Sequence, residues 1–312
     1  MTTAKVKAFV PIDIIDSMLV NSNLSEPYVL EPNWNSGSTY AEFEQVSVIT
    51  ANSHLMYESL QSGNINHPPP LPTIESDDWW ILKSYTNRWR QFEWGRGSAS
   101  IGGSPMITAI RPGKRINSIA LLGVKAAVVE VVVQDGIGGV EVLHITQDLL
   151  ARHALTHYEW AFTPFIYDNV FVSFDVPPVF DPVITVRLTH PDGVCEMARF
   201  CVGMAIDVGE VDWNTVLEDE NYPDVTYKAG KAELKSAQNI PGLQLPIEIE
   251  TKYINKVLQF KERSNGKVIV WSAMHDIDAY RQMHVIIGPP RRFAITSENH
   301  RLSSINLKIV GI

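Results

Sequence analysis

The chain has 312 residues, of which 45% are hydrophobic and 20% are charged, and its formal net charge is −9. This length and hydrophobic fraction predict a globular protein of two or three domains with sizeable cores. The negative charge argues against a protein that wraps nucleic acid through phosphate contacts. No apolar run reaches the length of roughly 18 residues that a membrane span requires.

The first 33 residues predict a short strand followed by an arm. The segment 5–14 has strand character, and a Pro-, Asn- and Ser-rich stretch follows it. That stretch has too few apolar residues for a domain of its own, so we expect residues 1–33 to form an N-terminal arm that packs on a neighbouring domain or subunit. The N-terminus lacks the apolar core and cleavage site of a signal peptide, which predicts assembly in a cytoplasm.

Residues 34–84 predict a small three-stranded β module. The stretches 45–50 and 54–60 alternate polar and apolar residues like the strands of a hairpin, and a Pro-rich connection at 63–72 follows them. Five of the eight tryptophans lie between Trp34 and Trp94. A dense aromatic group is typical of a binding face, but it also fills a small core, and both interpretations stay open.

Residues 85–210 predict a jelly-roll-like β-sandwich, because short β-branched stretches bounded by turn residues follow one another without helical periodicity. The stretches on either side of Asp135-Gly136 predict a hairpin. Cys195 and Cys201 are six residues apart on one face of a predicted strand. At ~3.3 Å per residue they lie about 20 Å apart, which predicts buried free thiols instead of a disulfide.

Residues 211–312 predict a β-rich C-terminal domain with a short helix. The acidic stretch 213–225 is expected to be a linker or a short helix. Apolar residues at helical spacing predict a helix over 253–264, which Asn265-Gly266 ends. The segment 284–312 predicts two strands and a loop, and its apolar end should be tied into a sheet.

No cofactor or metal site is predicted. The glycine-rich stretch 95–103 lacks the Gly-Lys-Ser/Thr ending of a phosphate loop, which favours a flexible loop or a contact between subunits. The segment 275–278, His-Asp-Ile-Asp, could ligate a metal, but no second ligand cluster accompanies it and a solvated turn is favoured. His153 and His157 lack the intervening Glu of a metalloprotease box.

The order of residues in the module resembles the small chitin-binding-type carbohydrate-binding modules. The shared pattern runs Trp, Tyr, Val-x-Val, Tyr-x-Ser-Leu, Asn, Pro-Pro and Trp-Trp, and Phe43-Glu44 departs from it where the family usually has Gly-Asp. Those modules are three-stranded β units whose aromatic rings stack on sugars. The resemblance implies a carbohydrate-binding face, with Asn64 and Asp78 near its rings. That face comprises Trp34, Tyr40, Tyr57, Trp79 and Trp80.

Beyond the module, the chain resembles a family of tailed-bacteriophage virion proteins. The motifs are Thr-Asn-Arg-Trp-Arg-Gln-Phe at 86–92, a strand at 116–123, and a closing pattern at 293–311. Their order along one chain covers roughly residues 34–125 and 270–312. The resemblance implies a structural protein of the phage tail or tail tip (baseplate), located in the virion and assembled in the host cytoplasm.

The leading hypothesis is therefore a non-enzymatic tail-tip or baseplate component that forms a symmetric homo-oligomer and contacts other tail proteins. Trp89, Phe92 and Trp94 are expected to form the joint between the module and the sandwich. One alternative is recognition of a host surface glycan through the carbohydrate-binding face. Another is a polysaccharide depolymerase using Asp77 or Asp78, whose apolar neighbours could raise a carboxyl pKa, although no opposed carboxylate is identifiable.

Overall fold

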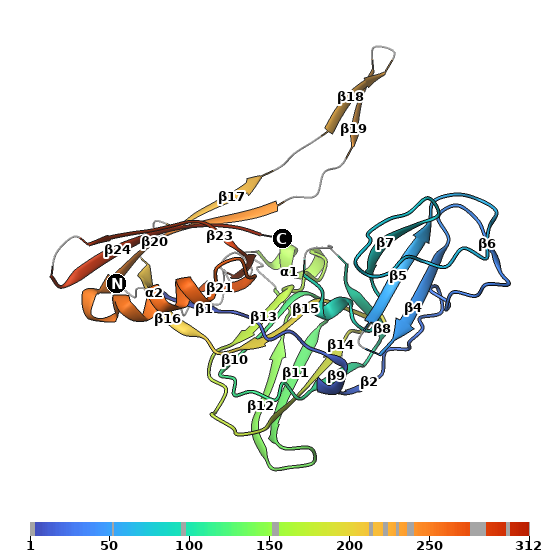
Figure 1. The fold of residues 1–312 in the computed structure, drawn as a ribbon. Coiled ribbons are helices and arrows are strands. Elements are labelled where there is room, and N and C mark those ends of the chain that lie inside the picture. Colours follow the sequence, from blue (N-terminus) through green and yellow to red (C-terminus); the bar gives the residue numbers. More distant parts are fainter. Residues whose placement is uncertain are drawn as a thin grey trace. The chain divides into compact units, whose positions relative to one another are not determined.

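The computed structural model describes residues 4–51, 53–94, 98–151, 156–211, 215–220, 224–228, 231–235, 240–274, 285–297 and 300–311. The chain forms two compact units (Figure 1). The central unit comprises Ile12–Val202, and the terminal unit combines Met1–Pro11 with Gly203–Ile312. This division differs from the four consecutive segments expected from the sequence, because the first strand of the chain joins a sheet formed by its last third.

Strands dominate both units, which confirms the predicted all-β class. The ladders between neighbouring strands are antiparallel. The described part of the chain has two α-helices, α1 (His157–Phe162) and α2 (Ile254–Arg263), and α2 confirms the predicted helix. No helix within the described residues combines the length and hydrophobicity needed to cross a bilayer.

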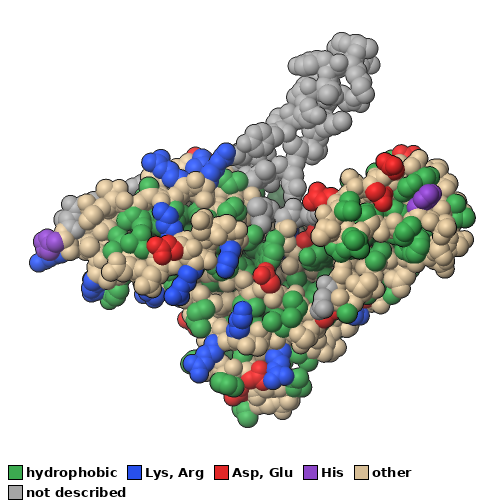
Figure 2. Space-filling model, viewed as in Figure 1, with side chains coloured by type: hydrophobic (Ala, Val, Ile, Leu, Met, Phe, Trp, Pro, Cys, Tyr) green, Lys and Arg blue, Asp and Glu red, His purple; other side chains and the backbone are tan. Residues whose placement is uncertain are grey.

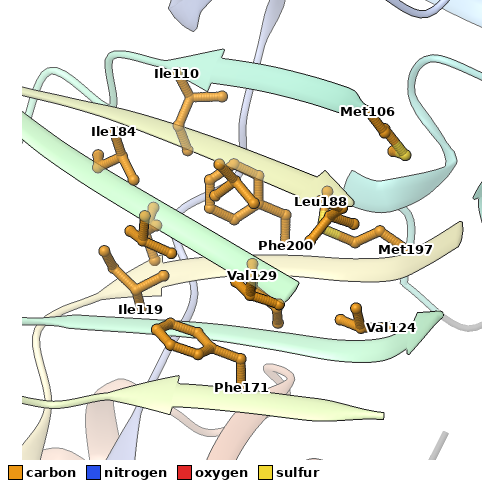
Figure 3. Close-up of a cluster of buried hydrophobic side chains, with 14 of the residues drawn as sticks. Met106, Ile110, Ile119, Val124, Val129, Phe171, Ile184, Leu188, Met197 and Phe200 are labelled. Atoms are coloured by element: carbon orange, nitrogen blue, oxygen red, sulfur yellow. The ribbon is translucent and has the colours of Figure 1, made fainter. Parts of the chain in front are cut away.

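The central unit contains a β-sandwich with a hydrophobic core between its sheets (Figure 3). One sheet has the order β13 (Val170–Ser173), β10 (Ser118–Lys125), β15 (Val194–Gly203) and β8 (Ser100–Gly103). The other has the order β12 (Glu141–Asp148), β11 (Val128–Asp135), β14 (Pro182–Thr189), β9 (Met106–Ile110) and β2 (Leu19–Ser22). The predicted hairpin is β11–β12. Buried and partly exposed residues alternate along β11: Val129, Val131 and Val133 are buried, and their neighbours in the strand are not.

The small module lies in the same unit and has its own core cluster. Its three-stranded sheet has the order β4 (Gln45–Thr50), β5 (Ser53–Ser59) and β7 (Trp80–Tyr85), and the predicted hairpin is β4–β5. The short strands β3 (Thr39–Tyr40) and β6 (Asn64–Ile65) pair beside it. The three-stranded architecture predicted from the sequence is therefore present.

The main element of the terminal unit is one large sheet with α2 packed on it. The order is β22 (Val285–Gly288), β21 (Ile269–Met274), β1 (Ala4–Phe9), β16 (Ile206–Val211), β20 (Ile240–Glu250), β24 (Leu302–Val310) and β23 (Pro290–Ser297). A further strand, β17 (Val216–Glu220), pairs with β20. From α2, Val257 is buried in the core and Phe260 meets Trp271 edge-to-face.

Two expectations for this unit are wrong. The acidic stretch at 213–225 contains strand β17, because β20 offers it a free edge to pair with, instead of a linker or short helix. The segment 284–312 forms three strands instead of two, because Pro289 separates β22 from β23 and lacks the N–H that a continuous strand would use for pairing. Here two backbone segments approach closely, since a Cβ on Gly288 would lie 2.0 Å from the Val310 carbonyl oxygen.

Cys195 and Cys201 are free and buried in β15, which confirms the sequence prediction. Burial raises the pKa of both thiols, and raises that of Cys201 to about 12. Because only the thiolate reacts, Cys201 should react with a disulfide reagent at pH 8 on the order of 10³-fold more slowly than a free cysteine. Both thiols should react at once in denaturant. Fast labelling of both thiols in the native protein would contradict this burial.

Candidate functional site

Three of the five aromatic residues assigned to the carbohydrate-binding face are core residues. Tyr40, Tyr57 and Trp80 are buried in the core cluster of the module. Trp80 Nε1 donates to the His67 carbonyl oxygen at 2.8 Å, and the Tyr57 hydroxyl donates to the Pro70 carbonyl oxygen at 2.9 Å. These rings therefore hold the Pro-rich connection onto the sheet, and they present no face to a sugar in solution.

Trp34 and Trp79 are the two members of that face that keep exposed surface. Both are half-buried and pack against the same core cluster. His67 stacks on Trp79 with the ring centroids 3.8 Å apart and the planes 9° from parallel. Trp79 can therefore offer one ring face at most to a ligand, and His67 holds that ring in place.

The polar residues beside these rings have structural partners. Asn64 is fully buried, and its amide nitrogen donates to Ser59 Oγ at 3.0 Å. Asp77 Oδ1 accepts hydrogen bonds from the backbone N–H groups of Trp79 and Trp80 at 2.8 and 2.6 Å. Asp77 thus closes the turn before β7, and Asp78 beside it is exposed to solvent.

Phe43 is an exposed aromatic residue in a strained backbone conformation. Its φ is 70°, in the left-handed region that favours glycine, and its side chain is 70% exposed. The turn is closed by a hydrogen bond from Glu44 N to the Ala41 carbonyl oxygen at 3.2 Å. A bulky residue in this region costs roughly 1–2 kcal/mol, so the Gly-to-Phe departure from the family pattern carries a real conformational cost.

Of the three expected joint residues, Trp89 contacts both the module and the sandwich. Trp89 and Phe92 belong to the sandwich core, and Phe92 stacks on Phe200 with ring centroids 5.9 Å apart. Trp89 also stacks on His54 of β5, with ring centroids 4.6 Å apart. Trp94 Nε1 donates to Asp13 Oδ1 at 3.2 Å.

The hydrogen bonds and ion pairs of this joint converge on one buried carboxylate, that of Glu26. Its side chain is 5% exposed. It accepts hydrogen bonds from Thr86 Oγ1, from Trp89 Nε1 at 3.3 Å and from Arg88 at 3.4 Å, and it pairs with His54 Nδ1 at 2.8 Å. The donors come from both β5 and the segment 86–90, so one carboxylate ties the module to the start of the sandwich.

His54 is held between two carboxylates. Its Nδ1 faces Glu26, and its Nε2 lies 2.9 Å from Asp16 Oδ2. Both ring nitrogens of His54 are therefore within hydrogen-bond distance of a carboxylate oxygen. A second buried carboxylate, Glu31, pairs with Arg90 in the same way that Glu26 pairs with Arg88.

Glu26 and Glu31 were not predicted as site residues, because they lie in a stretch that was expected to be an irregular arm. Each is followed by proline, and the two Glu-Pro pairs are five residues apart. Acidic residues repeated within an otherwise uncharged stretch were a usable signal, since a buried carboxylate needs a cationic partner and the 86–92 motif contains two arginines.

Among the described residues, no group of His, Cys, Asp or Glu side chains could hold a metal ion. The predicted segments 275–278 and 95–97, and His153, lie outside those residues. The rest of the glycine-rich stretch contributes β8, which pairs with β15. The described residues thus form a joint at the His54 end of β5, and the half-buried ring of Trp79 lies at the other end of that strand.

Replacing Glu26 by Gln should destabilise the protein by about 3 kcal/mol, because an amide NH₂ would face the Arg88 and Trp89 donors. The denaturant midpoint of unfolding measures this loss. The matched control, Glu42→Gln, changes an exposed glutamate of the module and should stay within about 0.5 kcal/mol of the original. Equal midpoints for the two variants would show that the carboxylate does not hold the joint.

Comparison with known proteins identifies no relative of this chain. No protein-family model, no curated protein and no solved structure matches it. The resemblance to virion proteins rests on the sequence motifs, and the function is therefore argued from those motifs and from geometry.

Proposed function

We propose that the chain is a structural component of a phage tail tip or baseplate. In this role it assembles into a symmetric oligomer in the virion and links the tail to its receptor-binding parts. The ordered motifs at 86–92, 116–123 and 293–311 point to this class of protein. The observation that carries the proposal is a pair of nested hairpins in the terminal unit.

The nested hairpins lie between residues 216 and 244. β17 pairs with the first half of β20, from Val216 opposite Gln244 to Glu220 opposite Ile240. Between these strands in the sequence, β18 (Asp224–Lys228) pairs with β19 (Lys231–Lys235) as a separate two-stranded sheet. Among the described strands, neither β18 nor β19 has another partner.

A two-stranded hairpin alone is marginally stable in water, because it buries little surface and leaves both outer edges unpaired. Unpaired edges are also ready templates for pairing with another chain. Such a hairpin becomes more stable when a neighbouring subunit covers its strands or pairs with their free edges. The nested hairpins are therefore expected to be ordered by another subunit of the assembly.

A second function is favoured by the aromatic face of the module. His67 fixes the ring of Trp79, and a sugar that stacks on a pre-ordered ring loses little side-chain entropy. Recognition of a host surface glycan would then use Trp79 and Trp34, without the three aromatic residues in the core.

Shortening the nested hairpins tests the first proposal. Glu220 and Ile240 are paired residues, so replacing residues 221–239 by Asn-Gly leaves a two-residue turn between β17 and β20. The fold should survive, with an unchanged circular dichroism spectrum per residue. Incorporation into particles should fall at least tenfold when the variant is supplied in place of the natural chain.

Mass spectrometry of purified particles measures this incorporation. The unmodified chain must be present in the particles, and its absence would refute a virion role. Equal incorporation of the shortened variant would instead refute the role of the hairpins and leave the virion role in place.

Binding to a glycan array tests the second function. Trp79→Ala should abolish any glycan signal, because it removes the exposed ring face that His67 supports. Leu71→Ala, an exposed apolar residue of the same module, is the matched control and should leave the signal unchanged. A glycan signal that survives Trp79→Ala would remove this ring from the binding face.

A further inference from the structure

Two strands of the terminal sheet keep an unpaired edge. Among the described strands, β23 (Pro290–Ser297) pairs only with β24, and β17 (Val216–Glu220) pairs only with β20. A third strand with a single partner, β22, is buried, and its end at Gly288 lies against the Val310 carbonyl oxygen. An unpaired edge offers a row of backbone N–H and C=O groups to any strand that reaches it, so β17 and β23 are the open positions of this sheet.

β23 has the features of an edge strand. Its first residue is Pro290, and proline, which has no N–H to donate, is tolerated at the start of a strand on the edge of a sheet. Arg292 and Thr296 are exposed on one face of the strand, while Phe293 packs against the core on the other. The Phe293 carbonyl oxygen accepts a hydrogen bond from exposed Lys261 at 3.2 Å, a side-chain contact that a strand N–H can replace. β23 can therefore accept a further strand.

The two open strands carry opposite charge, and neither mixes the two signs. The stretch 216–220 has three acidic residues and no basic residue, and 290–297 has two arginines and no acidic residue. The surroundings of β23 are basic as well, since Figure 2 shows Lys and Arg side chains predominating over Asp and Glu on the visible face of the terminal unit. Contact between the two different edges is therefore favoured over contact between like edges.

The directions of the strands fit this contact. β17 is antiparallel to β20, β20 to β24, and β24 to β23, so β17 and β23 of one sheet run in opposite directions. Rotation of one copy about an axis that is parallel to the strands keeps these directions. β17 of one copy then meets β23 of the next as an antiparallel pair, which is the slightly more stable of the two kinds of ladder.

Antiparallel pairing also brings the opposite charges together. The acidic residues lie at the C-terminal end of β17, from Glu218 onward, and Arg291 and Arg292 lie at the N-terminal end of β23. These two ends face each other when the strands are antiparallel and aligned, and cross-strand pairs of opposite charge stabilise a sheet. Two β23 strands related by a twofold axis would also be antiparallel, but neither strand has an acidic residue to offer to these arginines.

We infer that β17 of one copy of this chain adds to the open edge of β23 in a second copy, so that their terminal sheets join into one antiparallel sheet. The inference rests on the proposed function, because it names the contact through which the oligomer forms. Each copy has one strand of each kind, so the contact repeats from copy to copy and closes into a ring where the rotation allows it. The β18–β19 hairpin, which follows β17 in the chain, is then brought to the neighbouring copy.

Two exposed positions report this pairing. Glu218 pairs with Lys308, which places Glu218 and Val216, two residues before it, on the polar face of the sheet. Thr296 lies on that face too, since it is four residues from Arg292, the cross-strand partner of Lys308. With the strand ends aligned, Val216 of one copy lies opposite or diagonal to Thr296 of the next.

Cross-linking of the full chain tests the contact. Val216→Cys and Thr296→Cys variants are mixed in equal amounts and treated with a short bismaleimide. Because paired thiols meet at a raised effective concentration, the mixture should give a dimer of the two variants at a yield on the order of tenfold above either variant alone. The natural thiols do not interfere, since Cys195 and Cys201 are buried. The control, Val29→Cys mixed with Thr296→Cys, has an accessible thiol elsewhere and should give no such dimer.

Charge reversal tests the same contact without a cross-linker. Arg292→Glu replaces an opposite-charge pair with a like-charge pair, so it should weaken self-association roughly fivefold, measured by sedimentation. Arg263→Glu changes an exposed arginine at the end of α2 and is the matched control, which should leave association unchanged. Unmodified thermal unfolding of both variants confirms that they are folded. Equal association of the two variants would overturn the pairing of these strand ends.

Three further outcomes would overturn the inference. Thr296→Cys alone could cross-link as well as the mixture, which would show that β23 strands pair with each other. The mixture could give no dimer while light scattering shows an oligomer, which would place the contact elsewhere. The unmodified chain could also be monomeric at every concentration. Each of these results leaves the virion role to the particle composition, which is measured separately.

Discussion

The buried carboxylate of Glu26 is the constraint on which the arrangement of the central unit depends. A carboxylate removed from water is tolerated only where positive charge and hydrogen-bond donors surround it. Here those donors come from Thr86, Arg88, Trp89 and His54, which belong to two different parts of the unit. Apolar packing imposes no hydrogen-bond geometry, whereas this set of donors is satisfied in one arrangement. The module is therefore held on the sandwich by polar geometry at the edge of an apolar contact.

This joint explains how the tryptophans are divided. A module of about fifty residues buries little surface, so Tyr40, Tyr57 and Trp80 provide the large apolar side chains that its core needs. The ring of Trp89 packs in the sandwich core, and its Nε1 donates a hydrogen bond to Glu26. A dense aromatic stretch is thus mainly a structural requirement here, and only Trp34 and Trp79 retain surface that a ligand could use.

The sequence predicted the elements whose signals are local. The turn at Asp135-Gly136, the β4–β5 hairpin and helix α2 depend on neighbouring residues, and all three are present. Pairing between strands that lie far apart along the chain was not predicted. β1 pairs with β16 and β21, whose partner residues lie roughly 200 to 270 positions later. The acidic β17 becomes a strand because it pairs with β20. Glu26 was missed for the same reason, since its burial depends on residues some sixty positions later.

Folding accounts for the residues on the faces of the sheets, but not for the apolar residues on two loops. Along β11 the alternation sorts each side chain inward or outward, and the inward valines fill the core. Tyr158, Phe162 and Phe180 lie in loops that face water, and each is more than two-thirds exposed, so they add little to the core. Because β1 pairs with β16 on one edge and with β21 on the other, both of its hydrogen-bonding edges are occupied within the chain. Loop side chains at the ends of the sandwich then remain as exposed apolar surface among the described residues.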